Sequence, residues 1–173
     1  ANDVQTMIIL LKSLGSKVQI IKKKKILKIT NKKKHKLLVK YKYISTMRAG
    51  VLAMGALLGK YSKCSTALSG GCSLGPRPIG YHLAGFKKLN CRYSLNKGYI
   101  NIFSKRGIKG GSYHFPKVSV TGTSNLILAS VLANGQVITL KNISIEPEVL
   151  DLIKFLRNGG ARIYNTGKRT IKI

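Results

Sequence analysis

The sequence predicts an α/β protein built from a repeated unit of strand, helix, strand, helix, strand and strand. The first observation is that three amphipathic helices each lead through a polar or glycine turn into a strand of alternating residues. The second is a pair of helices that are apolar on nearly every side, because such helices must be buried between other elements. The third is that the copies recur at a period of roughly 70 residues.

The amphipathic helices belong to three copies of a helix, turn and strand. In the first copy Val4, Met7 and Leu11 lie at helical spacing, and the helix is expected to end at Gly15. The copies cover residues 3–20, 77–95 and 146–164. Each continues into a second strand with alternating apolar residues, predicted at 26–29, 99–103 and 170–173.

The two apolar helices are predicted at 49–58 and 125–133, and each precedes a short strand, near 65–68 or 136–140. The first copy lacks both its opening strand and its buried helix. The sequence therefore predicts about two and a half units, with boundaries at 1–45 for the partial unit, 46–105 and 106–173.

Composition limits the chain to one core. It has 173 residues, 44% of them apolar, and no apolar run approaches the ~18 to 20 residues of a spanning helix. The first residues do not read as a signal peptide, and the start at Ala1, within a structural unit, leads us to expect a fragment. Cys64, Cys72 and Cys91 match neither a metal site nor a paired disulfide framework, so we expect no metal and a reducing cytoplasm.

The net charge of +28 comes from 32 Lys and Arg against only 4 Asp and Glu. Such an excess is typical of nucleic-acid binding, because neutralised phosphates release counterions. The lysine runs at 22–25 and 32–36 contain no aromatic residues for base stacking, however, and the excess of lysine over arginine is typical of drift in an adenine- and thymine-rich gene. We therefore expect neither nucleic acid nor a membrane as a partner, although a basic surface would attract anionic substrates.

The most informative local pattern is Gly-Gly-Cys-Ser-Leu-Gly-Pro-Arg-Pro at 70–78. Glycines on both sides of Cys72 allow backbone conformations that approach a ligand, and Pro76 and Pro78 exclude helix at Gly75 and Arg77. A thiol near the Arg77 guanidinium is biased toward the thiolate and can act as an acid, base or nucleophile. From these residues alone, a buried structural cysteine beside a turn is an equally good interpretation.

Three blocks of the sequence together resemble the UDP-N-acetylglucosamine enolpyruvyl transferases (UDP-N-acetylglucosamine 1-carboxyvinyltransferases). Residues 70–78, followed by His82 and Gly85, resemble the catalytic loop and the helix after it. Two further blocks of this family are matched as well. The first resembles Thr-Met-Arg-Ala at 46–49 with the helix to 61. The second resembles Lys-Val-Ser-Val-Thr-Gly-Thr at 117–123 with Glu-Pro-Glu-Val-Leu-Asp-Leu at 146–152.

The resemblance implies an inside-out α/β barrel, in which three units surround a pseudo-threefold axis with helices inside and sheets outside. Residues 1–173 would form most of one such domain, and a second domain outside this chain would face it across the active site. The implied reaction transfers the enolpyruvyl group of phosphoenolpyruvate to the 3-hydroxyl of UDP-N-acetylglucosamine, the first committed step of peptidoglycan synthesis. The resemblance implies these two small-molecule substrates and no cofactor.

The resemblance also implies roles for individual residues. Cys72 would be the proton donor, and Arg48 and Arg77 would bind substrate oxyanions. Four residues would contact the uridine, and four would hold the nucleotide diphosphate: Pro78, Ile79, Gly80 and Tyr81, and then Lys117, Val118, Ser119 and Val120. Family members usually have aspartate where Gly80 stands, so one uracil contact is in doubt.

Part of the family machinery has no matching position in these residues. The lysine-asparagine pair of the first unit, the acidic general base and an arginine of the second domain are all missing, so the isolated chain is expected to lack turnover. Glu146 and Glu148 flank Pro147, which favours a helix start over an acid/base pair. We expect His82 to position the loop, His35 to be solvated among lysines, and Cys64 and Cys91 to lie in the core.

Two other functions remain open. The 5-enolpyruvylshikimate-3-phosphate (EPSP) synthases have a similar fold and use the same enolpyruvyl donor, but they lack the loop cysteine. The Gly-Gly-Cys loop with Arg-Pro therefore argues against them. The chain could also be a degenerate basic binding module, in which the residues that resemble catalytic ones no longer act.

Overall fold

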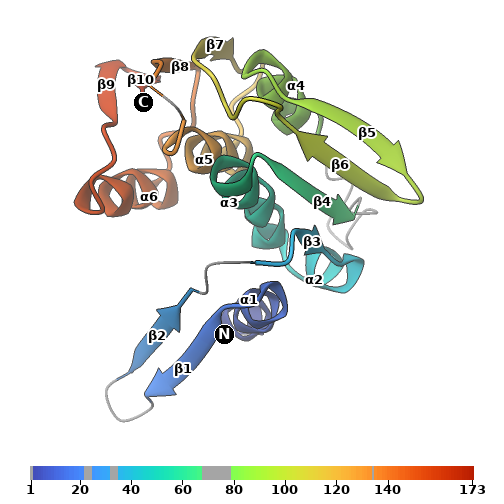
Figure 1. The fold of residues 1–173 in the computed structure, drawn as a ribbon. Helices are drawn as coiled ribbons and strands as arrows, with labels where there is room; N and C mark the ends of the chain where they lie inside the picture. The colour runs from blue at the N-terminus through green and yellow to red at the C-terminus, as the bar shows by residue number, and fades with distance from the viewer. Residues whose placement is uncertain (1, 22–24, 32–34, 68–78, 134) are drawn as a thin grey trace.

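The structure, a computed structural model, describes residues 2–21, 25–31, 35–67, 79–133 and 135–173. Its central, complete unit begins with a short strand and ends with a β-hairpin (Figure 1). The elements of this unit are β3 (Leu38–Val39), α2 (Tyr41–Thr46), the 3-10 helix η2 (Arg48–Val51), α3 (Leu52–Tyr61), β4 (Lys63–Ala67), α4 (Gly80–Lys88), β5 (Arg92–Asn96) and β6 (Tyr99–Phe103).

A second complete unit follows, and a partial one precedes. The later unit contains β7 (Gly111–His114), α5 (Val120–Ser130), β8 (Ile138–Lys141), α6 (Pro147–Asn158), β9 (Tyr164–Gly167) and β10 (Thr170–Lys172). The partial unit contains α1 (Asn2–Leu14), β1 (Lys17–Ile21) and β2 (Ile26–Thr30). It therefore matches only the last helix and hairpin of the other two.

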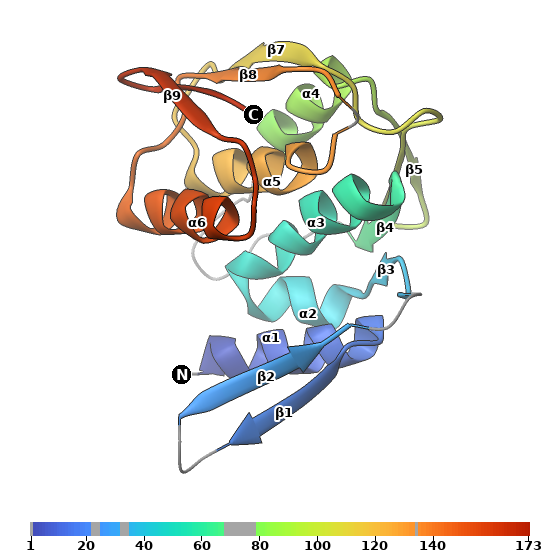
Figure 2. The same cartoon turned by 60° about the vertical axis from the view of Figure 1, so that its left-hand side comes forward.

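Strand pairing confirms the predicted repeat. The two four-stranded sheets have the orders β3-β4-β6-β5 and β7-β8-β10-β9, so each strand of one has its counterpart in the other. In both sheets the first pair is parallel and the other two are antiparallel. The antiparallel pair β1-β2 matches β5-β6 and β9-β10. The three sheets lie outside the helices (Figure 2), as the inside-out arrangement requires.

Three boundaries differ from the predicted ones. Strand β3 pairs with β4, so the central unit begins at Leu38, earlier than the boundary after residue 45 that we expected. The helix predicted from residue 125 begins at Val120, because Ser119 caps its N-terminus although the first turn is mostly polar. The helix predicted at 49–58 is divided into η2 and α3.

The centre of the fold is the close crossing of α3 and α5. Gly55 and Gly59 lie one turn apart on α3, and both face the backbone of α5. A Cβ atom at Gly59 would lie 2.8 Å from the Ala129 carbonyl oxygen, and one at Gly55 would overlap the backbone of Asn125. Glycine is therefore required at both positions for the two helices to approach this closely.

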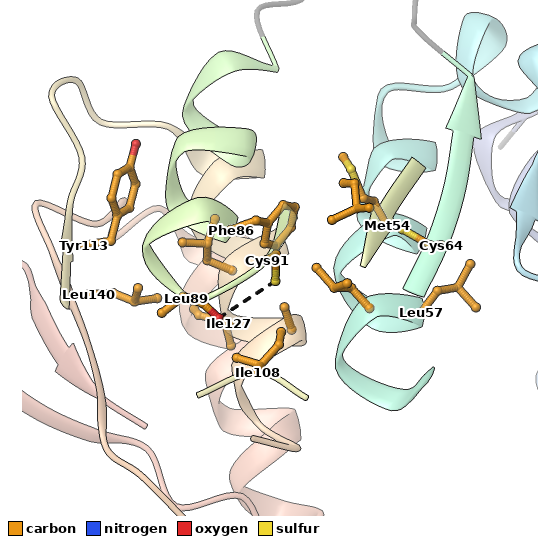
Figure 3. Packing of buried hydrophobic residues seen from close by; sticks show 14 of the residues in the cluster. Met54, Leu57, Cys64, Phe86, Leu89, Cys91, Ile108, Tyr113, Ile127 and Leu140 are labelled. Carbon is orange, nitrogen blue, oxygen red and sulfur yellow. Dashed lines mark hydrogen bonds between the residues drawn. The ribbon is translucent and has the colours of Figure 1, made fainter. Parts of the chain in front are cut away.

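The hydrophobic core surrounds this crossing. Met54 of α3, Phe86 of α4 and Ile127 of α5 are buried together between the helices and the sheets (Figure 3). Cys64 and Cys91 are 4% and 3% exposed, which confirms that both belong to the core. Among the described residues, every helix is too short or too polar to cross a bilayer.

Candidate functional site

A cleft of about 880 Å³ opens where the N-terminal ends of η2 and α5 meet the side of α6. Arg48 and Ala49 line it from η2, and Ser119 and Val120 line it from the start of α5. The remaining lining residues are Asp3, Leu52, Val118, Thr121, Ser124, Glu148, Asp151, Leu152 and Phe155. The cleft therefore brings together four of the predicted substrate-binding residues, Arg48, Val118, Ser119 and Val120.

The N-terminus of α5 is built to accept an anion. Ser119 is the N-cap residue, and its hydroxyl oxygen accepts a hydrogen bond from the Gly122 amide at 3.1 Å. The Ser119 O–H remains able to donate to a ligand. The amides of Val120 and Thr121 lie in the first turn, where no carbonyl of the same helix is available to them. These donors and the helix dipole favour negative charge in the cleft.

Arg48 is exposed at the first residue of η2, and its position agrees with the repeat. Arg48 begins η2, which leads into α3, and Ser119 precedes α5, so the segments before both central helices face one cleft. A guanidinium here can donate two parallel hydrogen bonds to a carboxylate or phosphate.

Three of the four acidic residues of the chain also line this cleft, which the sequence did not reveal. Glu148 and Asp151 lie one helical turn apart on α6, next to Leu152 and Phe155, and Asp3 lies in the first turn of α1. The spacing of 148, 151, 152 and 155 was the available signal, since it places these residues on one helix face. Their carboxylates can accept hydrogen bonds from the hydroxyl groups of a ligand.

Glu146 and Glu148 occupy the helix start that the sequence favoured. Glu146 is the N-cap residue of α6, Pro147 is at the first helical position, and Glu148 lies in the first turn. Acidic side chains are stabilised there by the positive end of the helix dipole.

The predicted uridine-contacting segment lies at the start of α4. Ile79 is the residue before the helix, and Ile79 and Tyr81 pack partly buried against the core. Gly80 is exposed, and a Cβ atom there would have no neighbour within 4 Å. Lys117 is exposed and does not line the cleft. Cys72, Arg77 and Pro78 lie outside the described residues.

His82 is buried in the first turns of α4, and its Nδ1 accepts a hydrogen bond from Asn125 Nδ2 at 2.9 Å. Burial lowers the pKa of His82 to about 4, so the ring is neutral at physiological pH. Because Nδ1 accepts, the ring proton is on Nε2. Because its imidazole is buried, neutral and bonded to Asn125, His82 has a structural role and is not placed to act as an exposed acid or base.

His35 is half-buried, so it is less solvated than the sequence predicted. Its Nδ1 lies 2.5 Å from the Tyr61 hydroxyl, and its Nε2 lies 3.3 Å from the Ser16 hydroxyl. Desolvation and the nearby Lys60 charge lower the pKa of His35. These partners are distant in sequence, so the surrounding lysine run gave no sign of them.

The thiols of Cys64 and Cys91 are poorly suited to chemistry. Burial, with a smaller contribution from Cys91, raises the pKa of the Cys64 thiol to about 12, and burial raises the pKa of the Cys91 thiol to about 12. The Cys91 sulfur lies 3.9 Å from the Leu89 carbonyl oxygen (Figure 3). In the described part of the chain, no group of three or more His, Cys, Asp or Glu residues is placed to hold a metal ion.

Comparison of the sequence with known proteins gives a family and several curated relatives. The family model described as EPSP synthase (3-phosphoshikimate 1-carboxyvinyltransferase) matches residues 1–173. A UDP-N-acetylglucosamine 1-carboxyvinyltransferase of Pelagibacter ubique is 46% identical over 171 residues, which is 99% of this chain and 40% of that protein. One from Coxiella burnetii is 39% identical over 172 residues, covering 99% of this chain and 39% of that protein. The chain thus spans about 40% of the length of the curated relatives that it matches.

Solved structures show the same fold at low sequence identity. The enolpyruvyl transferase NikO from Streptomyces tendae matches 98% of this chain and 40% of its own, with a TM-score of 0.78 and 14% identity. EPSP synthase from Acinetobacter baumannii matches 100% of this chain and 39% of its own, with a TM-score of 0.65 and 17% identity. These likenesses confirm the inside-out α/β arrangement.

Proposed function

Because the chain belongs to the EPSP synthase family, we propose that the protein carrying it transfers the enolpyruvyl group of phosphoenolpyruvate to the 3-hydroxyl of UDP-N-acetylglucosamine. The observation that carries this proposal is the cleft in which Arg48 meets the N-terminus of α5. The similarity to UDP-N-acetylglucosamine 1-carboxyvinyltransferases supports the choice of acceptor. The reaction would take place in the cytoplasm, as the first committed step of peptidoglycan synthesis.

In this proposal the anionic substrates bind to the donors that line and flank the cleft. The Ser119 hydroxyl, the first-turn amides of α5 and Lys117 hold the diphosphate of the nucleotide. Arg48 and Arg77 bind the carboxylate and phosphate of phosphoenolpyruvate. The uridine lies against the segment that ends at Tyr81 and includes Pro78, Ile79 and Gly80.

The chemistry is an addition followed by an elimination. The sugar hydroxyl oxygen bonds to C2 of phosphoenolpyruvate as its proton passes to the family's general base, which has no match in this chain, while Cys72 delivers a proton to the methylene carbon. The C2–O bond to phosphate then breaks, and the Cys72 thiolate takes back a proton from the resulting methyl group, which restores the double bond and gives the enolpyruvyl ether. The cations at the cleft stabilise the negative charges of the phosphate and carboxylate throughout.

The full reaction needs more than this chain. No residue of the chain matches the family's general base, lysine-asparagine pair or second-domain arginine. We therefore expect turnover only from the full-length protein, with the isolated chain inactive. The EPSP synthase alternative predicts shikimate 3-phosphate as the acceptor, and a degenerate basic module predicts no turnover at all.

The test measures phosphate release from phosphoenolpyruvate by the full-length protein with each acceptor in turn. We expect release with UDP-N-acetylglucosamine and none with shikimate 3-phosphate. Arg48→Lys should lower kcat/KM roughly 10²-fold, because an ammonium loses the paired geometry of the guanidinium. Arg92→Lys, on an exposed position of β5, is the matched control and should leave the rate unchanged.

Two results would contradict the proposal. Release that requires shikimate 3-phosphate would reassign the acceptor. Equal rates for Arg48→Lys and Arg92→Lys would show that the cleft at Arg48 is not where the substrates react.

A further inference from the structure

Asn125 is a buried polar side chain at the centre of the fold, and it makes three hydrogen bonds. It is 0% exposed, and it lies on α5 where the polar residues that end at Ser124 give way to the apolar run 126–129. Its Oδ1 accepts a hydrogen bond from the Gly55 amide at 2.6 Å. Its Nδ2 donates to the Val51 carbonyl oxygen at 3.1 Å and to His82 Nδ1 at 2.9 Å. Both amide hydrogens and the oxygen therefore have partners, which fixes the orientation of the carboxamide.

The two backbone partners of Asn125 are those that would bond to each other in an uninterrupted α-helix. The amide of residue 55 would donate to the carbonyl of residue 51, one turn earlier. Here the carboxamide accepts a hydrogen bond from the first and donates one to the second, at the junction where η2 ends and α3 begins. Asn125 therefore holds the end of η2, which starts at Arg48, and the first turn of α3 against α5.

The third partner extends this connection to α4. His82 is 3% exposed and lies in the turn that follows Ile79 and Gly80. The Asn125 carboxamide on α5 therefore contacts both η2 and α4. The N-terminal ends of these two helices carry predicted substrate-binding residues. Its own helix carries Ser119 at the third end.

We propose that Asn125 is a positioning residue that sets the relative placement of Arg48, the start of α4 and the start of α5. The inference rests on the proposed function, because those three ends are assigned there to the two substrates. Asn125 does not line the cleft, so it acts through the elements that it holds and not by touching substrate. Loss of its hydrogen bonds would let η2 and the start of α4 move relative to α5. A displacement of about 1 Å at a binding group is enough to cost ~10²-fold in rate.

The test compares Asn125→Leu with a matched control on the same helix, in the full-length protein. Asn125→Leu removes all three hydrogen bonds. Thr123→Val removes one buried hydrogen bond, from the Ser144 amide to Thr123 Oγ1 at 3.0 Å, and both of those residues are fully buried. Thr123 holds the segment before α6 and has no hydrogen bond to α3 or α4. Asn125→Asp is a second variant of native shape, which can still accept from Gly55 but cannot donate to Val51 or His82.

Hydrogen exchange is the first measurement and needs no ligand. In both Asn125 variants we expect faster amide exchange in two separate regions, 48–56 and 79–86, while Thr123→Val should speed exchange only near 144. Titration with UDP-N-acetylglucosamine is the second measurement. The Kd should rise about tenfold or more in the Asn125 variants and stay within twofold of wild type in Thr123→Val.

The outcomes separate the two proposals. If either folded Asn125 variant exchanges like wild type in both regions, or keeps the wild-type Kd while exchange changes, Asn125 is not a positioning residue. If wild-type protein does not bind UDP-N-acetylglucosamine, the proposed function fails instead. The exchange pattern then still decides whether Asn125 joins the three helix ends.

Discussion

A methyl group added at Gly55 tests the close crossing of α3 and α5 on which the rest of the fold depends. In most helices Gly→Ala is stabilising, by about 1 kcal/mol, because alanine has the higher helix propensity. At Gly55 the new Cβ would overlap both the main-chain oxygen and the side-chain oxygen of Asn125. The first of these atoms belongs to the backbone of a buried helix, so it cannot move without shifting α5. We therefore expect Gly55→Ala to destabilise the protein.

The size of the effect follows from three contributions. Overpacking of a core by one methyl group costs ~1 to 3 kcal/mol. Separation of α3 from α5 also breaks the hydrogen bond from the Gly55 amide to Asn125, and leaving buried groups unpaired costs ~1 to 3 kcal/mol. After the gain in helix propensity, the free energy of unfolding should fall by roughly 1 to 5 kcal/mol. For a domain of this size, each kcal/mol lowers Tm by about 2 to 4 °C.

Thermal unfolding followed by circular dichroism measures this change against two other glycines. Gly80→Ala is the control, because its Cβ would contact nothing and Gly80 is exposed at the start of α4. Its Tm should equal or slightly exceed that of wild type. Gly59→Ala should lower Tm in the same direction as Gly55→Ala, since its Cβ would lie 2.8 Å from the Ala129 carbonyl oxygen. Equal Tm values for Gly55→Ala and Gly80→Ala would refute the close helix crossing.

The repeat could be predicted from the sequence because each unit carries its own local signals. Helical spacing of apolar residues, followed by a glycine turn and alternation, depends only on neighbours within about twenty residues. The shared cleft of Arg48 and Ser119 follows from the same repeat, since both residues precede a central helix. Helix α5 starts earlier than predicted, because Thr121, Gly122 and Thr123 in its first turn carry no apolar periodicity.

What the sequence could not predict are contacts between distant segments. The sequence predicts Asn125 as the first residue of an apolar helix, but its partners lie on η2, α3 and α4, at 74, 70 and 43 positions from it. The contacts of His35 with Ser16 and Tyr61 likewise join separate elements. No local periodicity encodes such pairs, because they are created by the packing of whole helices.

Three further predictions concern single side chains. In the native protein, a maleimide should not alkylate Cys64 or Cys91 rapidly, whereas both thiols should react after unfolding. Rapid labelling of either thiol in the native state would contradict its burial. Gly80→Asp should tighten UDP-N-acetylglucosamine binding up to roughly tenfold, because it adds a hydrogen-bond acceptor where a side chain has free space. If the Kd measured by titration is unchanged, position 80 does not face the uracil. The last prediction concerns pH. Burial lowers the pKa of His82 from 6.5 to about 4, so the unfolded chain binds a proton near pH 6.5 that the folded protein does not bind until about pH 4. The contribution of this neutral histidine to the free energy of unfolding is therefore complete above pH 6.5, and it is lost as the pH falls toward 4, by at most about 1.4 kcal/mol per pH unit. In urea titrations between pH 7 and 4, His82→Gln should lose less stability than wild type over this interval even if it is less stable at pH 7. Parallel pH profiles of the two proteins would mean that His82 takes up its proton at the same pH in the folded and unfolded states, so that burial does not lower its pKa.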